Sequence, residues 1–166
     1  MSSGAVIREF RESDWATVWP LLKDTFAAGD TYTFPPDIAE AEARKAWVEI
    51  PYATFVAEVD GKIAGTYFIK PNQPGLGSHV CNCGYVVSPR AQGRGIAASM
   101  CEHSQRFAIE RGFRAMQFNF VVSTNERAVR LWQRLGFEVV GRLPGAFRHR
   151  TLGFVDALVM YKTLTA

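Results

Sequence analysis

The sequence has no long hydrophobic run, no large net charge and no paired set of cysteines. No apolar stretch is long enough to span a bilayer, so we expect no membrane partner. Its 19 Lys and Arg residues against 16 Asp and Glu residues leave a net charge of +3, which is too small and too dispersed to indicate nucleic-acid binding. A charge of this kind would still suit a polyanionic cofactor.

The 3 cysteines, Cys81, Cys83 and Cys101, are an odd number, and no apolar leader follows Met1. Disulfide frameworks use even numbers of cysteines, so we expect a reduced, cytoplasmic protein. Cys81 and Cys83 would share one face of a strand, but a metal site needs further ligands, and His79 is the only neighbour that offers one. Small buried cysteines are the commoner reason for such a pair, so we expect no metal.

Length and composition predict one domain spanning residues 1–166. With 166 residues, 48% of them hydrophobic, the chain can bury a single core, which excludes disorder as its main state. No internal repeat, low-complexity stretch or linker divides it.

Hydrophobic periodicity predicts a mixed α/β domain. The predicted elements are a strand at 5–10, a helix from 13 or 14 past 26, a helix at 37–48, strands at 54–59 and 62–69, a strand at 79–88, a helix at 96–111, a strand at 113–122, a helix from 123 to 135, and strands at 137–143 and 154–162. A basic, aromatic loop at 145–150 is expected to join the last two strands.

Local signals predict how several of these elements begin and end. Ser13 or Asp14 is the expected cap of the first helix, and Pro20 should kink or split that helix. The Asp60-Gly61 pair is expected to form a hairpin turn. Ser123, with a glutamate three residues later, has the form of a capping box.

The stretch 85–97 runs from an apolar strand through a turn into a helix, and it has the features of a phosphate-binding turn. Pro89 lacks an N–H group and ends the strand, while Gly93 and Gly95 let the backbone approach a ligand closely. The helix that follows directs its unpaired N–H groups and its partial positive charge at the turn.

Two common glycine-rich motifs do not fit this turn. The dinucleotide fingerprint requires a third glycine where Ala98 stands, and the P-loop requires a Gly-Lys-Ser/Thr end that is absent. The remaining pattern, Gln92-x-x-Gly95-x-Ala97, resembles the pyrophosphate loop of the GCN5-related N-acetyltransferases (the GNAT family), which reads Gln/Arg-x-x-Gly-x-Gly/Ala.

A second motif lies downstream of the first. It is similar to the family's Asn-x-x-Ala-x-x-Leu-Tyr-x-x-x-Gly-Phe element and reads Asn125-x-x-Ala128-x-x-Leu131-Trp132-x-x-x-Gly136-Phe137. With the order of the elements, the two motifs extend the resemblance over nearly the whole chain. The resemblance implies an α/β GNAT fold, with a mixed central sheet of about seven strands splayed between strands 4 and 5 and about four helices.

The resemblance also implies that acetyl-CoA is the cosubstrate and lies between the splayed strands. The residues implied to bind it are Val86, Val87, Gln92, Gly93, Arg94, Gly95, Ile96, Ala97 and Asn125. A backbone N–H group of the strand ending at Val87 would stabilise negative charge in the tetrahedral intermediate. Arg90, Arg94 or Arg127 would neutralise the phosphates, or each is an ordinary surface arginine.

The sequence departs from the family at two positions that handle protons. Trp132 stands where many members have a tyrosine acid, and Gly84 stands where many have a glutamate base. Proton transfer must then use water, the CoA thiolate, or a group elsewhere such as Tyr85, His149 or Glu58.

Two asparagines offer a different kind of assistance. Asn82 should share a strand face with Gly84, and Asn119 lies mid-strand across the expected cleft. Amides cannot act as bases, but they can position an acceptor and its nitrogen. The pair resembles the fungal acetyltransferases of proline analogues such as azetidine-2-carboxylate. Alternatively, Asn82 and Asn119 only satisfy neighbouring backbone groups.

Two aromatic segments are candidate acceptor-binding elements. Tyr32 and Phe34 belong to a loop between two predicted helices, which either lines an acceptor pocket or simply connects those helices. Phe147 and His149 lie in the hairpin that, by the resemblance, borders the acceptor site, where Arg148, His149 or Arg150 would suit a carboxylate. The alternative is a basic surface loop.

These features together predict an N-acetyltransferase that transfers acetyl from acetyl-CoA to the amine of a small molecule, most plausibly an amino or imino acid. Acetylation of a protein or peptide amine is an alternative on the same fold. A non-catalytic acyl-CoA sensor is a third, because the usual Tyr and Glu are missing. Exposed edge strands near the C-terminal hairpin make a homodimer reasonable.

Overall fold

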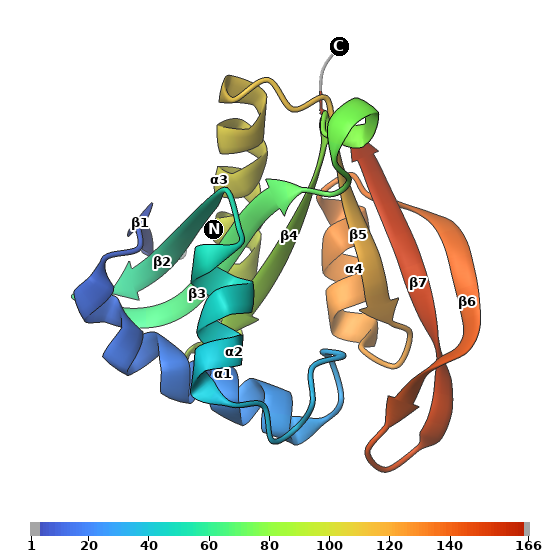
Figure 1. Ribbon diagram of the computed structural model, residues 1–166, viewed down its shortest axis with the longest axis horizontal. Helices are drawn as coiled ribbons and strands as arrows, with labels where there is room; N and C mark the ends of the chain where they lie inside the picture. The colour runs from blue at the N-terminus through green and yellow to red at the C-terminus, as the bar shows by residue number, and fades with distance from the viewer. Residues whose placement is uncertain (1–3, 165–166) are drawn as a thin grey trace.

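The computed structural model describes residues 4–164 as one layer of sheet covered by helices on both faces (Figure 1). The strands are β1 (Val6–Glu9), β2 (Ala53–Val59), β3 (Lys62–Pro71), β4 (Val80–Val87), β5 (Ala115–Val122), β6 (Glu138–His149) and β7 (Gly153–Thr163). The helices are α1 (Trp15–Ala28), α2 (Glu40–Arg44), α3 (Ile96–Glu110) and α4 (Glu126–Arg134), with short turns η1 (Glu12–Asp14), η2 (Lys45–Glu49), η3 (Gly75–Gly77) and η4 (Pro89–Ala91). Within this part of the chain no helix has the length and apolarity to cross a membrane.

The sheet is mixed and opens at its centre. Its seven strands follow the order β1-β2-β3-β4-β5-β7-β6, and only β4 and β5 run parallel. These two strands pair only at Val80–Ala115 and Cys81–Met116, after which they diverge, as Figure 1 shows. The predicted splay between strands 4 and 5, the strand number and the four helices are confirmed.

Each face of the sheet has its own hydrophobic core. One core packs α3 and α4 against residues such as Cys83 and Phe118, and the other packs α1 and α2 against residues such as Phe68 and Val86. Because successive strand residues point to opposite faces, Tyr85 belongs with the α3–α4 core while its neighbours Gly84 and Val86 face α1 and α2. We call the α1–α2 side the acceptor face.

The hairpin signals in the sequence are largely confirmed. Asp60 and Gly61 both have positive φ angles, 52° and 75°, as a two-residue hairpin turn requires. The last hairpin is longer than predicted, because β6 extends to His149 and pairs Phe147 with Val155. The predicted basic loop at 145–150 is therefore mostly strand, and a register shift between Leu143 and Phe147 hides its periodicity.

Three predictions about helix ends and breaks differ from the structure in part or in full. Asp14 is the N-cap residue of α1, as predicted, but its carboxylate accepts hydrogen bonds from Arg8 and from the backbone N–H of Arg11 and makes no cap bond to the helix. Pro20 lies inside α1 without splitting it, since burial of the helix's apolar side holds the helix together. Asn125, and not Ser123, caps α4.

The predicted helix at 37–48 begins later and ends differently. Helix α2 starts at Glu40 and passes directly into a π-helical turn, η2, at Lys45. This turn places the buried Trp47 against Phe68 and lets its indole N–H donate to the Thr66 hydroxyl at 3.1 Å. The π turn thus positions the aromatic packing of the acceptor face.

Candidate active site

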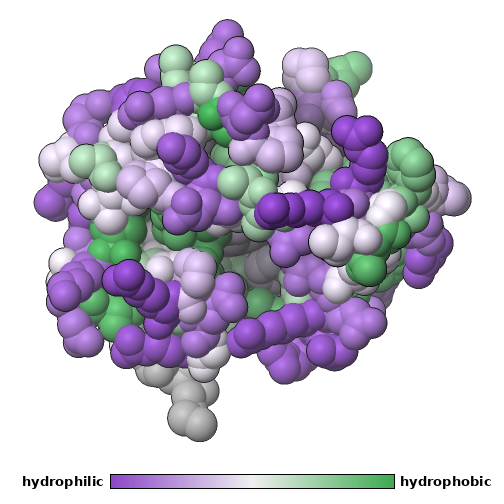
Figure 2. All heavy atoms as spheres, turned by 90° about the horizontal axis from the view of Figure 1, so that it is seen from below, coloured by the Kyte–Doolittle hydropathy of each residue, from purple (hydrophilic) through white to green (hydrophobic). Residues whose placement is uncertain are grey.

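A cleft of about 990 Å³ opens where β4 and β5 diverge. Its walls come from the C-terminal half of α1 and the loop after it, β3, β4, the turn before α3, β5 and α4. Seen from below in Figure 2, the molecule has a central hollow with hydrophobic side chains inside and hydrophilic side chains along its rim. The cleft therefore combines an apolar channel with polar ends, as an extended ligand with a charged terminus requires.

The turn before α3 has the geometry of an anion-binding site. Gly93 and Gly95 have φ angles of 80° and 77°, a conformation that other residues rarely adopt. Gly95 is the N-cap of the 15-residue helix α3 and has no side chain to bond the free N–H groups of the first turn. Those N–H groups and the helix dipole are therefore available to a phosphate at the cleft.

The predicted cofactor residues mostly meet at this end of the cleft. Those that line it are Val86, Val87, Gln92, Gly93, Gly95, Ile96, Ala97 and Asn125. The side chain of Arg94 is exposed and does not line the cleft.

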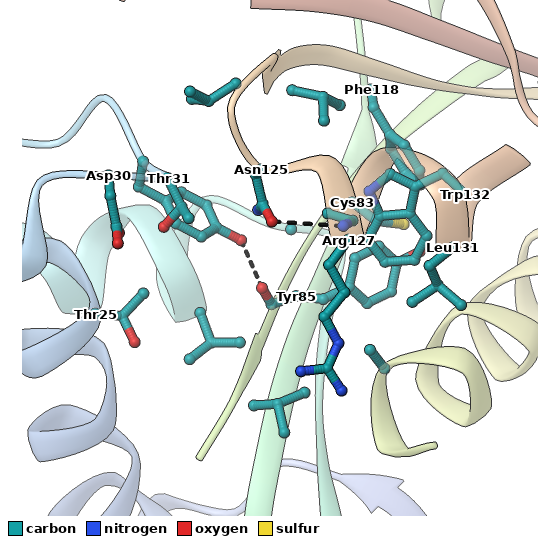
Figure 3. A pocket seen from close by; sticks show the side chains of 18 of the residues that line it. Thr25, Asp30, Thr31, Cys83, Tyr85, Phe118, Asn125, Arg127, Leu131 and Trp132 are labelled. Atoms are coloured by element: carbon teal, nitrogen blue, oxygen red, sulfur yellow. Dashed lines mark hydrogen bonds between the residues drawn. The ribbon is translucent and has the colours of Figure 1, made fainter. Parts of the chain in front are cut away.

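Cationic side chains from α4 face the turn. The Arg127 guanidinium lies only 3.7 Å from the position that a Cβ on Gly93 would occupy, and Figure 3 shows it extending from α4 toward the turn. Arg134, the last residue of α4, also lines the cleft, and the sequence did not predict it. Arg90 does not line the cleft, so Arg127 and Arg134 are the arginines placed to neutralise phosphate.

Asn125 has a structural role that the sequence reading missed. Its side-chain oxygen accepts a hydrogen bond from the backbone N–H of Ala128 at 3.4 Å and so caps α4 (Figure 3). The amide nitrogen remains the group suited to donate to a bound pantetheine arm. The same residue thus fixes the start of α4 and lines the cleft.

Tyr85 does not present its phenol to the acceptor face. Its hydroxyl is 2.6 Å from the Ser104 hydroxyl on α3, and its ring packs against Trp132 with centroids 5.1 Å apart (Figure 3). Burial raises the pKa of the Tyr85 phenol well above its ordinary value. A buried, protonated phenol bonded to Ser104 is poorly placed to exchange a proton with an amine.

Aromatic groups fill the space beside Gly84 that the side chain of the usual glutamate would need. A Cβ on Gly84 would lie 2.6 Å from Phe68 Cε1 and 3.2 Å from the Tyr32 hydroxyl. The Tyr32 hydroxyl donates to the backbone carbonyl of Tyr85 at 2.8 Å, and burial raises the pKa of Tyr32 far above the neutral range. This part of the site holds a hydrogen-bond donor and no base.

The two predicted asparagines lie on the edges of the splay and both line the cleft. The Asn82 amide donates to the backbone carbonyl of Gln117 at 2.9 Å, directly after the last paired residues of β4 and β5. Asn119 accepts from the Gln117 side chain at 2.8 Å and donates to Asn72 at 2.6 Å. A chain of amides therefore crosses from β4 to β5. The Asn82 amide satisfies a backbone carbonyl, as the alternative interpretation expected, whereas the Asn119 bonds go to side chains.

Lys70 is a cation at the cleft that the sequence reading missed. It pairs with Asn82 across β3 and β4, is half-buried, and has its ammonium 5.5 Å from the centre of the Phe68 ring. Predicting its place from the sequence would have required the register of β3 against β4. The loop at 72–79 has no turn signal that fixes this register.

The hairpin residues Phe147 and His149 do not line the cleft. Phe147 is buried and packs edge-on against Phe120, which does line it. The Nδ1 atom of His149 accepts backbone N–H groups from Thr151 and Leu152 at 3.1 and 3.2 Å, so the ring stabilises the β6–β7 turn.

The other groups considered for proton transfer lie elsewhere. Glu58 accepts hydrogen bonds from Arg8 and does not line the cleft. His103 on α3 also lies outside the cleft: it is half-buried with its Nδ1 atom 2.7 Å from the Tyr67 hydroxyl, and burial lowers its pKa.

The sequence is similar to those of known acetyltransferases. Residues 15–137 match the model of the acetyltransferase (GNAT) family. N-acetyltransferase aca1 of Schizosaccharomyces pombe is 40% identical over 106 residues, which make up 62% of this chain and 51% of that protein. The match thus spans about half the length of this relative.

Two solved structures show the likeness in three dimensions. A GCN5-related N-acetyltransferase from Kribbella flavida superposes with a TM-score of 0.91 at 38% identity, covering 96% of this chain and 98% of that one. A phosphinothricin acetyltransferase from Sinorhizobium meliloti in complex with acetyl-CoA has a TM-score of 0.86 at 18% identity, with 96% and 88% coverage, which is a likeness of fold alone.

Proposed function

Because the chain belongs to the GNAT family of acetyltransferases, we propose that it transfers the acetyl group of acetyl-CoA to the amine of a small molecule, an amino or imino acid. Acetyl-CoA is the cosubstrate of this family, and the residues of the cleft fit it. The turn at 92–97 suits the pyrophosphate, Arg127 and Arg134 suit the remaining phosphate charge, and the apolar channel between β4 and β5 suits the pantetheine arm.

The observation that favours a small acceptor is the closure of the acceptor face by the loop after α1. The carbonyl of Gly29 accepts the backbone N–H of Arg150 at 3.1 Å, which joins this loop to the β6–β7 hairpin across the opening of the sheet. Farther along, the Tyr32 hydroxyl bonds to β4. A loop tied down on both sides leaves an aromatic-walled site in place of the open groove that a protein chain would need.

The proposed chemistry is direct attack by the neutral amine on the thioester carbonyl. The carbon–nitrogen bond forms, a backbone N–H group of β4 near Val86 stabilises the oxyanion, and the carbon–sulfur bond then breaks to release CoA thiolate. Asn82 and Asn119 orient the acceptor nitrogen. With Tyr85, His149 and Glu58 engaged elsewhere, we assign the amine proton to water and to the departing thiolate.

Two wider properties are proposed on separate grounds. Cys81, Cys83 and Cys101 are all buried and unbridged, which favours a reducing compartment such as the cytoplasm.

Strand β6 ends the sheet and is exposed along most of its length, with Val140 59% exposed, so we propose that it pairs two copies into a homodimer. Sedimentation equilibrium of the wild type and of Val140→Lys tests the dimer, because only the wild type should show twice the monomer mass.

The proposed function is tested by letting acceptors compete. Purified protein is incubated with acetyl-CoA and an equimolar mixture of imino acids, amino acids, polyamines and short peptides, and acetylated products are identified by mass spectrometry. Acetylated amino or imino acids as the main products would support the proposal. Acetylated peptides alone would overturn it in favour of a protein acceptor, and bound acetyl-CoA without any product would favour a sensor.

A further inference from the structure

We propose that Lys70 binds the carboxylate of the acceptor and thereby selects acids over other amines. This inference rests on the proposed function, since it concerns the same acceptor site. It names the group on the protein that recognises the substrate class.

Lys70 lies on the acceptor face next to the reacting position. It stands directly opposite Asn82 in the antiparallel pair of β3 and β4, two pairs along from Phe68 and Gly84 and on the same face of the sheet. Two residues along a strand correspond to about 7 Å, a distance that a lysine side chain and an α-carboxylate can bridge together. An amine held beside Gly84 would therefore have its carboxylate within reach of the Lys70 ammonium.

The charge of Lys70 has no partner within residues 4–164. Each ion pair in that part of the chain involves other residues. The Lys70 ammonium lies over the Phe68 ring, 5.5 Å from its centre. A half-buried cation that lines a cleft without a carboxylate beside it is well suited to bind an anionic ligand group.

The other charged residues that line the cleft are not suited to bind the acceptor carboxylate. Arg127 and Arg134 belong to α4 and face the cofactor end, whereas Asp24 and Asp30 would repel a carboxylate. The cations of the β6–β7 hairpin, Arg148 and Arg150, were the sequence-based candidates for a carboxylate, but they do not line the cleft. Neighbouring Asn82 and Asn119 are neutral and cannot balance the charge of a carboxylate.

The test compares each acceptor acid with its carboxamide, which keeps the amine and removes the negative charge. Values of kcat/KM are measured for wild type, Lys70→Met, Lys70→Arg and the control Lys62→Met, which removes an exposed lysine at the other end of β3. We expect Lys70→Met to lower kcat/KM for the acid by about 10- to 100-fold, in line with the loss of a charged hydrogen bond. Activity on the carboxamide and affinity for acetyl-CoA should change little, and Lys70→Arg should restore part of the activity.

The outcomes separate this inference from the proposed function. Turnover of acids by the wild type with an equal loss on acid and carboxamide in Lys70→Met, or with no loss at all, would overturn the role of Lys70 and leave the function intact. Failure of the wild type to acetylate any small amine would overturn both.

Discussion

Gly84 shapes the acceptor site by having no side chain. Phe68 and Tyr32 occupy the space that a Cβ would need, and Tyr32 reaches the β4 backbone through this gap. The aromatic wall and the missing glutamate are therefore one structural feature, because either group excludes the other. An enzyme built this way must rely on positioning and on the backbone for catalysis.

Substituting alanine at this position tests the packing. Gly84→Ala places a Cβ 2.6 Å from Phe68, and we expect it to lower the free energy of unfolding by about 1–3 kcal/mol and to reduce kcat/KM. Chemical denaturation and steady-state kinetics measure both. Gly141→Ala on β6 is the matched control, since its Cβ would meet Val159 at an ordinary 3.7 Å and should change neither quantity. A Gly84→Ala protein of wild-type stability would contradict the crowding described here.

His103 should make stability depend on pH. Burial lowers its pKa below the ordinary value near 6.5, so the unfolded chain binds the proton more readily than the folded one. Its contribution to stability is complete above that ordinary value and falls as the pH drops below it. We expect the melting temperature to fall between pH 7 and pH 5, as measured by calorimetry.

Two variants identify the group responsible. His103→Gln should flatten the fall in melting temperature between those pH values, whereas His79→Gln, which alters an exposed histidine, should leave it unchanged. The same fall in both variants would assign it to other groups.

Single residues of the site differ in how well the sequence predicts them. The glycines of the turn and Asn125 could be predicted as cleft residues because their spacing along the chain is itself the signal, and they do line the cleft. Lys70 and the bond from Tyr32 to β4 were missed because each depends on segments brought together by folding. His149 was misjudged for a related reason, since a histidine that caps its own turn has the same sequence as one that faces a ligand.

At the scale of elements, the turn before α3 and helix α4 form one unit around the cofactor end of the cleft. Lys162 on β7 donates to the Leu135 carbonyl at the end of α4 and to the Gln105 side chain on α3, at 2.7 and 2.6 Å. These bonds tie the C-terminal end of α4 to α3. A residue outside both family motifs, Lys162, therefore joins the end of α4 to the body of α3.

Gly95→Glu tests the turn as an anion-binding element. We expect acetyl-CoA binding to be lost, because a carboxylate side chain would enter the space of the pyrophosphate, while the fold persists. Calorimetric titration with acetyl-CoA measures the affinity. Gly112→Glu is the control, since Gly112 has a similar φ of 85° and open space around it at the end of α3. Equal affinity in the two variants would show that the turn does not bind the cofactor.

Elements with strong local signals were predicted well, and those governed by packing were not. The order of strands and helices follows from periodicity, and the Asp60-Gly61 turn follows from its residue types. The π turn η2 and the register shift of β6 depend on how neighbouring side chains pack. Such packing produces no periodic pattern in the sequence, so neither feature could be predicted. Pro20 is a further case, because burial of the apolar side of α1 keeps the helix continuous despite a residue that breaks helices locally.

At the scale of the whole molecule, the splayed sheet separates two tasks. The α3–α4 side holds the cofactor turn and buries Tyr85 and Trp132, while the α1–α2 side presents the aromatic wall, the amides and Lys70. The connection between Gly29 and Arg150 closes the acceptor side across the opening. This closure is the observation on which the proposal of a small acceptor, in place of a protein chain, depends.

The most direct test measures CoA thiol release with a free imino or amino acid and with a dipeptide that carries the same residue at its N-terminus. Both acceptors offer the same kind of amine, but the dipeptide is larger and moves the carboxylate away. A closed acceptor site with Lys70 at its end predicts a kcat/KM for the free acid at least about 10-fold above that for the dipeptide. Equal or faster turnover of the dipeptide would contradict the closed site and indicate a peptide or protein acceptor.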